Sequence, residues 1–429
     1  MLSLVLFGTM LLLFALGLPV AFSMGLAAAA ALGVMPRATF EVIAQRMFYG
    51  LDSFLILSVP LFVLLGELME SAKITHRLVD FAAALVGRLR GGLGHISIVT
   101  NMVMSGISGS GTADAAATGS VLIPAMTRAG YPVAFSAALV GASATIGPII
   151  PPSIIMVIYA SIANVSIGRM FLGGVVPGLL MGGALMVLTA YLARRNDFPR
   201  GVSLAGRARV EAVRRAVLVL MAPVIVIVGI VGGVFTATES AGVACLYALI
   251  LGLVVYRTVK PGDLPDILQR TALTTGRVMF VFAAASIFSW ILARGGVPAQ
   301  IGELPLIGDT SRPWLMLIAL NVLLLVLGAL MDSLAILLIV TPIILPIAVK
   351  AGIDPVHLGV MISVNLSIGL VTPPVGSIMF VLCGLTRCSI AEFSREIGIF
   401  VAVLIVPLLL TTYVPQFVLF LPDLLMGVR

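Results

Sequence analysis

The sequence predicts an all-α polytopic membrane protein, and three observations lead to this fold class. The chain of 429 residues is 60% hydrophobic and 10% charged, with a mean hydropathy of +1.20, so it has more apolar side chains than a soluble protein can hide. Apolar runs of roughly 20 residues recur, which is the length of a helix that crosses a bilayer. No alternation over roughly ten residues appears, as a membrane β-barrel would require.

The N-terminal run MLSLVLFGTM is expected to stay as a first membrane segment, because it lacks a positive start and continues past the usual length of a signal peptide. The three cysteines are odd in number and lack metal-ligand spacing, so they predict neither disulfides nor a zinc site. The net charge of +7 comes mostly from Lys and Arg beside apolar segments, which is typical of membrane topology and does not indicate nucleic-acid binding.

An arginine-rich stretch, residues 194–215, divides the chain into two apolar halves, 1–193 and 216–429. A shift of about 222 positions places the helix breakers of one half on those of the other. The matched pairs are Pro124 and Pro346, Gly130 and Gly352, Gly147 and Gly369, Pro151 and Pro373, and Pro152 and Pro374. We therefore interpret the halves as repeats, joined by a basic linker that is expected in the cytoplasm.

Each half is expected to contain about five transmembrane helices, one of them broken, and one re-entrant helical hairpin. The hairpins are predicted at about 95–127 and 315–349, and the broken helices at about 132–163 and 354–385. The third crossing of the second half is predicted at 279–293 and the last at 397–420. Because the number of crossings per half is odd, the repeats would be inverted and both termini would face the outside. Most Lys and Arg residues then lie on the cytoplasmic side.

The broken helices contain matching stretches, IGPIIPPS (146–153) and IGLVTPPV (368–375). Proline in a helix interior costs about 3 kcal/mol or more and removes a backbone donor. Unwound backbone at membrane depth is tolerated where it lines a polar cavity, and its freed carbonyls can bind Na⁺. Paired discontinuous helices in inverted repeats are the plan of many secondary transporters, so the breaks predict an ion and substrate site.

The hairpin turns supply further candidate ligands. The first, SGISGSGTADAA, is rich in glycine and hydroxyl groups; the alternative is close helix packing through small residues. In it, Asp114 is either an ion ligand or a helix cap. In the second turn Asp332 is a lone acid, which is costly at membrane depth and suggests a bound cation; the alternative is a hydrogen bond to a hairpin amide. Glu67 and Glu239 are expected to be structural.

Neutral oxygen ligands flank both breaks and would suit a hard cation. They are Ser143, Thr145, Asn365, Ser367 and Thr372. Asn365 has the alternative role of a cap or a packing contact.

Five stretches together resemble the large membrane subunit, of the DctM type, of a tripartite ATP-independent periplasmic (TRAP) transporter. They are SGSGTADAA (108–116), IGPIIPPS (146–153), GVFTATESAG (233–242), GALMDSLA (328–335) and LVTPPVG (370–376). The resemblance covers nearly the whole chain. It implies an elevator-type secondary transporter, driven by Na⁺, that imports organic acids such as C4-dicarboxylates, sialic acid and other sugar acids.

The resemblance also implies partners and a location. A periplasmic substrate-binding protein of the DctP type would deliver the organic acid, and a small membrane subunit of the DctQ type would complete the complex. Because the sequence starts directly with the large subunit, the small one is expected to be a separate chain. The lipid bilayer would be a bacterial or archaeal inner membrane.

The resemblance further implies two or more Na⁺ ions, one at each hairpin tip and its break. The first set of ligands is Ser108, Gly109, Ser110, Ser143, Thr145, Gly147 and Pro148. The second set is Gly328, Met331, Asp332, Ser333, Ser367, Gly369 and Thr372. Residues expected against the substrate are Ser108, Ser110, Thr112, Asn365 and Thr372. The prolines Pro151, Pro152, Pro373 and Pro374 are expected to be structural helix breaks.

Two other functions compete with this interpretation. A stand-alone Na⁺/dicarboxylate symporter would share the architecture and work without a binding protein. An intramembrane serine protease is suggested by GISG (106–109), but the three histidines of the chain lie at segment ends or in loops, where none can serve as the base. The chain has no GxxxxGK[ST] phosphate loop, so an ATP-driven pump is not indicated.

Overall fold

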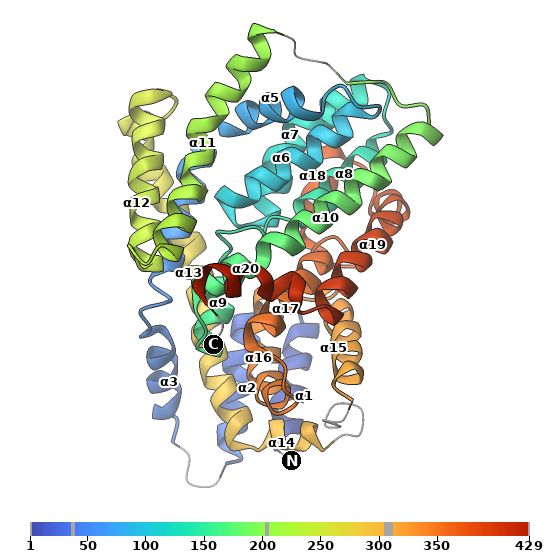
Figure 1. Cartoon of the computed structure of the whole chain (residues 1–429). Helices are drawn as coiled ribbons and strands as arrows, with labels where there is room; N and C mark the ends of the chain where they lie inside the picture. The colour runs from blue at the N-terminus through green and yellow to red at the C-terminus, as the bar shows by residue number, and fades with distance from the viewer. Residues whose placement is uncertain (1, 36–38, 202–205, 304–311, 428–429) are drawn as a thin grey trace.

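The computed structural model describes residues 2–35, 39–201, 206–303 and 312–427, and Figure 1 shows this part of the chain as helices joined by turns. The helices of the first half are α1 (Leu2–Ala15), α2 (Val20–Gly33), α3 (Glu41–Leu51), α4 (Ser58–Ser71), α5 (Ile74–Val86), α6 (Gly92–Ser108), α7 (Gly111–Arg128), α8 (Val133–Ala144), α9 (Ile154–Ala163) and α10 (Ile167–Arg195). Those of the second half are α11 (Arg207–Val231), α12 (Ala237–Ile250), α13 (Leu264–Arg294), α14 (Val297–Gly302), α15 (Pro313–Gly328), α16 (Ser333–Lys350), α17 (Pro355–Gly369), α18 (Ser377–Thr386), α19 (Ile390–Tyr413) and α20 (Gln416–Met426).

Six helical stretches in the described part of the chain are long and apolar enough to cross a membrane, which confirms the predicted all-α membrane protein. They are Ile167–Arg195, Arg207–Val231, Ala237–Val255, Pro261–Arg294, Ser333–Lys350 and Ile390–Tyr413. Shorter apolar helices, among them α8, α9, α17 and α18, flank the two predicted breaks.

The helices around the breaks recur at the offset seen in the sequence. In the first half α7, α8 and α9 begin at Gly111, Val133 and Ile154. In the second half α16, α17 and α18 begin at Ser333, Pro355 and Ser377, about 222 residues later. Both hairpins therefore have two helical arms, and both breaks separate two short helices.

The halves differ in one scaffold element. The first half has two helices, α3 and α4, where the second has the continuous α13. The interruption contains Asp52 and Ser53, and the matched residues of α13 are Thr274 and Thr275. Ser53 Oγ shares a hydrogen bond of 3.5 Å with Ser161 Oγ of α9. The predicted crossing at 279–293 is thus the end of a much longer helix.

The basic linker predicted at 194–215 is shorter than expected, because α10 continues to Arg195 and α11 begins at Arg207. Strong helix formers in RARVEAVRR explain this early start. The connection is held against the base of the first hairpin: Arg90 forms an ion pair with Asp197, and the Gly91 N–H donates to the Pro199 carbonyl at 3.1 Å.

The crossing predicted at 397–420 is wrong at its end. Helix α19 stops at Tyr413, and α20 is a separate helix that crosses α10 (Figure 1). Pro415 follows the last turn and prevents its continuation. A part-buried ion pair anchors α20, because Arg169 Nη2 lies 2.5 Å from Asp423 Oδ1 and Arg169 Nη1 donates to the Gly427 carbonyl at 2.7 Å.

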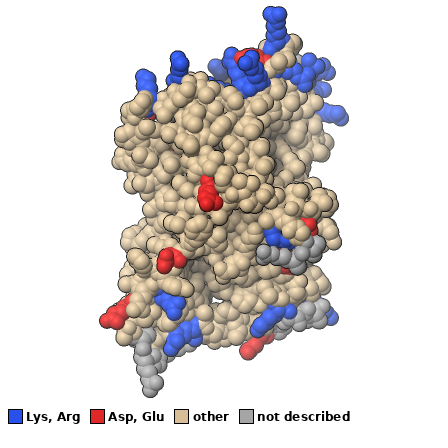
Figure 2. All heavy atoms as spheres, turned by 60° about the vertical axis from the view of Figure 1, so that its left-hand side comes forward, with Lys and Arg blue, Asp and Glu red and all other residues tan. Residues whose placement is uncertain are grey.

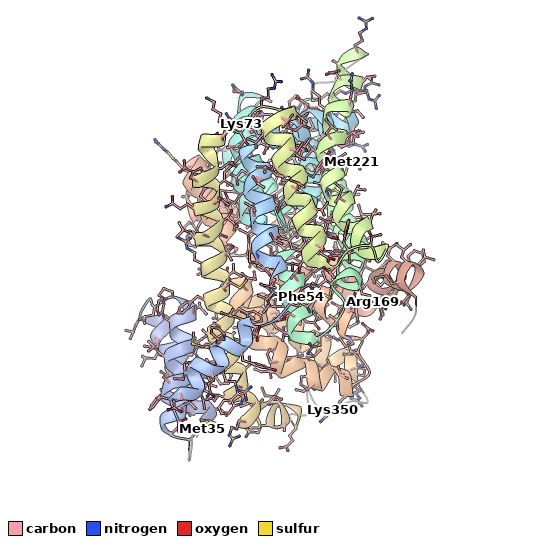
Figure 3. The ribbon with its side chains drawn as sticks, turned by 90° about the vertical axis from the view of Figure 1, so that its left-hand side faces the viewer. Met35, Phe54, Lys73, Arg169, Met221 and Lys350 are labelled. Atoms are coloured by element: carbon pink, nitrogen blue, oxygen red, sulfur yellow. The ribbon has the colours of Figure 1, made fainter. Side chains whose placement is uncertain are left out.

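Charged residues gather at the ends of the molecule. Figure 2 shows Lys and Arg at one end, a largely uncharged body, and both signs of charge toward the other end. In Figure 3 Lys73 lies near the first end and Met35 and Lys350 near the second, with Phe54 and Arg169 between them. The predicted structural role of Glu239 is confirmed: it forms a capping box with Thr236 at the start of α12.

Candidate functional site

The tip of the first hairpin is a tight turn between α6 and α7. Gly109 has φ +61°, and a Cβ there would lie 2.5 Å from the Pro152 carbonyl oxygen, so only glycine fits. Ser110 then caps α7, because its Oγ accepts from the Ala113 N–H at 3.5 Å. The predicted residues Ser108 and Ser110 thus lie at the turn itself, beside the first break.

The first break lies between Ala144, where α8 ends, and Ile154, where α9 begins. Tight turns replace the α-helix here, and the Gly147 N–H donates to the Ala144 carbonyl at 3.0 Å. Ser153 restarts the helix: its Oγ accepts from the Met156 N–H and donates to the Pro148 carbonyl at 2.5 Å. The carbonyl of Pro148, predicted as an ion ligand, therefore already accepts one hydrogen bond.

The hairpin tip and the break meet at two glycines. A Cβ on Gly147 would lie 2.7 Å from Asp114 Oδ2 and 2.9 Å from the Gly111 nitrogen. A Cβ on Gly111 would lie 2.9 Å from the Ala144 carbonyl oxygen. The absence of side chains at both positions lets carboxylate and carbonyl oxygens converge, which is the donor set that a hard cation prefers.

Asp114 was left open in the sequence between ion ligand and helix cap, and the structure assigns the cap to Ser110 instead. Asp114 is fully buried, and its Oδ1 accepts from Ser108 Oγ at 2.5 Å. Its Oδ2 has no hydrogen-bond partner among the described residues. A buried carboxylate oxygen without a donor is costly, so this geometry fits a bound cation. The sequence signal was an acid in the first turn of the second hairpin arm.

The second hairpin meets the second break in the same way. A Cβ on Gly328 would lie 3.1 Å from the Gly369 Cα. Ser333 Oγ donates to the Leu366 carbonyl at 3.2 Å, and the Val375 N–H donates to the Ala329 carbonyl at 2.9 Å. The structure thus brings the predicted residues Gly328, Ser333 and Gly369 together.

Asp332 is the N-cap of α16, and its Oδ1 accepts from the Leu334 N–H at 2.9 Å. This is the alternative that the sequence left open, a hydrogen bond to a hairpin amide. The residue is exposed, unlike Asp114, so its other oxygen can reach an ion or solute that approaches the tip. Met331 precedes it and is half-buried.

Two predicted ligands belong to buried polar networks. Ser143 Oγ accepts from Asn101 Nδ2 at 2.6 Å and donates to the Val140 carbonyl, which leaves little capacity for an ion. Asn365, at the matched position of the second half, donates to Asn321 Oδ1 at 2.8 Å. Both networks bind a hairpin to its broken helix. Asn365 Oδ1 is buried without a hydrogen-bond partner among the described residues, so Asn365 packs through its amide nitrogen and keeps an oxygen for an ion.

The remaining hydroxyls at the breaks donate back to their own helices. Thr145 Oγ1 donates to the Ala142 carbonyl, Ser367 Oγ to the Ser363 carbonyl and Thr372 Oγ1 to the Ile368 carbonyl. Each hydroxyl keeps an oxygen lone pair, so each remains a possible ion ligand. Thr112, which lies near Ser110, exchanges a hydrogen bond of 3.2 Å with the Ser110 hydroxyl.

Each site is built from both halves of the chain. Helix α18 packs on α7, and α9 packs on α16 and α17 (Figure 1). A Cβ on Gly359 would lie 2.2 Å from the Tyr159 ring, whose hydroxyl donates to the Pro355 carbonyl at 2.7 Å. The breaks therefore belong to one interlocked unit with the hairpins.

Two cavities border this unit. A cavity of about 110 Å³ reaches Ser108 and Ser110 and is walled by α4 and α13. A second, of about 490 Å³, lies between the end of α3, α9, α13 and α16, and meets α16 at Leu338 and Pro342. The first cavity thus touches the first hairpin tip, whereas the second contacts the middle of α16, away from the second tip.

Within the described ranges, no three His, Cys, Asp or Glu side chains cluster to hold a metal, so the proposed ion ligands are mostly carbonyls and hydroxyls. Ser108, the protease candidate, donates to Asp114 and lies at the far end of α6 from His95. His357 bonds instead to the Thr411 carbonyl. The site therefore has no histidine base.

Known proteins resemble this chain along nearly its whole length. Residues 7–417 match the family model "Tripartite ATP-independent periplasmic transporter, DctM component". The sialic acid TRAP transporter large permease protein SiaM of Vibrio cholerae is 40% identical, covering 98% of both chains. The C4-dicarboxylate TRAP transporter large permease protein DctM of Rhodobacter capsulatus is 36% identical, covering 99% of both chains.

A solved structure supports the fold. The YdaH transporter of Alcanivorax borkumensis superimposes with a TM-score of 0.60 and covers 88% of both chains. The sequence identity is 16%, so this likeness concerns the architecture alone.

Proposed function

Because the chain belongs to the DctM family of tripartite ATP-independent periplasmic transporters, we propose that it carries an organic acid across the inner membrane in symport with Na⁺. Membership makes it a multi-pass transporter permease and not an enzyme, so the protease interpretation is wrong. The observation that carries the proposal is the buried, unpartnered Asp114 Oδ2 where the first hairpin tip meets the first helix break.

We assign the first Na⁺ to this junction. Asp114 adds a negative charge to the predicted ligands, and the Ala144 carbonyl lies nearby. The second Na⁺ is assigned to the junction where the Gly328 and Gly369 backbones touch, beside the Thr372 hydroxyl oxygen. The lack of side chains at the glycines supports both assignments, since an ion needs close backbone approach.

The substrate is proposed to lie against Ser108, Ser110 and Thr112, where the small cavity reaches the tip. Hydroxyl groups suit carboxylates and sugar hydroxyls alike. The substrates in the names of the relatives, sialic acid and C4-dicarboxylates, are both organic acids, and we propose this class for the chain.

The proposed mechanism is an elevator built from two inverted repeats. The first tip borders the small cavity, which also reaches Ile74 next to Lys73, while the second cavity meets α16 six to ten residues past Asp332. At 1.5 Å per helical residue, a shift of roughly 9–15 Å would bring the second tip to that cavity. The interlocked hairpins and broken helices support movement as one body.

Orientation and partners follow from charge and family. The end rich in Lys and Arg (Figure 2) is proposed to be cytoplasmic, and both termini are proposed to face the periplasm. A periplasmic binding protein of the DctP type would deliver substrate there, and a small DctQ-type subunit would join in the bilayer.

The test is the thermal stability of the purified chain in NaCl and in KCl at equal ionic strength. A ligand that binds only the folded state stabilises it by about 2.7 kcal/mol at a hundredfold excess over its Kd. We expect a Na⁺-specific rise that shrinks in Asp114→Asn and in Asp332→Asn. Equal stability in both salts, for a folded sample, would contradict the Na⁺ sites.

The second candidate is a stand-alone symporter. Reconstitution with and without a binding protein and small subunit separates the two, because the stand-alone carrier would transport in their absence.

A further inference from the structure

The small cavity connects the first hairpin tip to a pair of acidic side chains. Its walls include Ser108 and Ser110 at the hairpin tip, Glu67 and Glu70 of α4, and Thr274 of α13. An anion in this cavity therefore lies beside two carboxyl groups.

An arginine lies one helical turn from Thr274, on the same face of α13. Arg270 Nε donates to Glu67 Oε2 at 2.9 Å, and Arg270 Nη2 donates to Ser71 Oγ at 3.1 Å. The Arg270 side chain is 52% exposed and that of Glu67 is 21% exposed. The guanidinium is thus half exposed, with its Nε and one Nη2 donor directed at α4.

The opposite cavity lacks this pair although it uses matched scaffold positions. Ser289 stands where Glu67 stands in the first half, and Asp52 takes the place of Thr274. The position matched to Arg270 is Phe48, which is exposed. The ion pair is therefore a property of one end of the molecule and not a requirement of the scaffold helices.

We propose that Glu67 is a positioning residue that restrains Arg270, so that an organic anion is released at this end instead of being held there. A free guanidinium binds carboxylates through parallel hydrogen bonds. Pairing with Glu67 offsets the charge of Arg270 and occupies its Nε donor, Ser71 accepts from Nη2, and Glu70 adds a second carboxyl group beside the cavity. This role rests on the proposed function, because it concerns release of an acidic substrate.

The test compares Glu67→Gln, Arg270→Gln and the double variant in the reconstituted complex. In Glu67→Gln, the freed Arg270 should hold the substrate through a charge-assisted hydrogen bond. Substrate exchange measured from the Lys73 side should then be about tenfold slower, and the substrate concentration that gives half-maximal exchange there should be about tenfold lower. The double variant should return close to wild type. Glu211→Gln, which breaks an exposed ion pair with Arg215 on α11, is the matched control and should change nothing. Equal impairment of Glu67→Gln and the double variant would overturn the proposal.

A second measurement needs no transport. Succinate, compared with chloride at equal ionic strength, should raise the melting temperature of purified Glu67→Gln by more than that of wild type or the double variant. If succinate shifts the melting temperatures of Glu67→Gln and the double variant equally, the proposed restraint of Arg270 by Glu67 is contradicted, even where Na⁺-driven transport occurs. If the succinate shift is larger in Glu67→Gln than in the double variant but no organic acid is transported with Na⁺, the proposed function is contradicted and the restraint of Arg270 is supported.

Discussion

The two helix breaks have the same pattern, Gly-x-x-x-Pro-Pro, but different surroundings. In the first, the residues from Thr145 to Ser153 are buried except for the half-buried Ile150. In the second, Pro374 and Val375 are exposed. The acids at the two tips differ in the same direction, since Asp114 is buried and Asp332 is exposed. Equivalent backbone breaks can therefore form one enclosed site and one open site.

The long helix behind each break explains this difference. In α10, Gly174 and Gly178 let the first break approach: a Cβ on Gly174 would lie 2.3 Å from the Ile149 carbonyl oxygen. Helices α10 and α19 begin 223 residues apart, so the matched residues of α19 are Ile397 and Val401. The branched side chains at these positions leave no gap like the one that Gly174 and Gly178 leave for the first break.

The largest expected effect separates the two acids. Asp114→Asn should reduce Na⁺-driven uptake by about 100-fold or more and remove most of the Na⁺-dependent thermal shift, because it removes the charge of the enclosed junction. Asp332→Asn should reduce uptake but keep part of the shift. Uptake at varied Na⁺ and melting curves measure both, with Asp80→Asn, exposed on α5, as the control. Equal thermal shifts in Asp114→Asn and wild type would show that the enclosed site holds no Na⁺.

The next effect tests why the first break is enclosed. Gly174→Ala should lower the free energy of unfolding by about 1–3 kcal/mol, since its Cβ would collide with backbone. Gly183→Ala, in the same helix with nothing within 4 Å, should be neutral or stabilise by up to about 1 kcal/mol. Thermal or chemical unfolding of both variants checks the comparison. Similar stabilities would mean that α10 does not enclose the break.

Chemical labelling should reveal the difference in exposure directly. In a background with Cys245, Cys383 and Cys388 replaced by serine, a thiol introduced as Val375→Cys should react with a water-soluble maleimide about tenfold faster than one introduced as Ser153→Cys. The two positions match at the repeat offset; Val375 is 45% exposed and Ser153 is buried. Equal rates would show that the first break opens as readily as the second.

The smallest effect concerns the caps of the second hairpin arms. Ser110→Ala and Asp332→Ala should each cost about 1 kcal/mol of stability, because each removes an N-cap acceptor. Asp332→Asn should keep the cap. If Asp332→Asn unfolds as easily as Asp332→Ala, the charge of Asp332 stabilises the tip beyond its capping role.

The pattern of proline and glycine predicted where helices stop but not how they cover one another. The break between α8 and α9 follows from Pro151 and Pro152, and the all-α class follows from hydropathy. The separate α20 and the early start of α11 were missed, because apolar runs do not mark a turn such as that at Pro415. Ser143 was predicted as an ion ligand, yet its partner Asn101 comes from another helix that spacing cannot place beside it.

The sequence by itself determined the membrane class, the family and the positions of both breaks, because hydropathy, proline and glycine act through local backbone chemistry. Only the tertiary structure decided that Asp114 is buried with one free oxygen, that Asp332 is exposed, and that Glu67 holds Arg270. Each of these depends on side chains from segments far apart in the chain, whose contacts arise only when the helices pack.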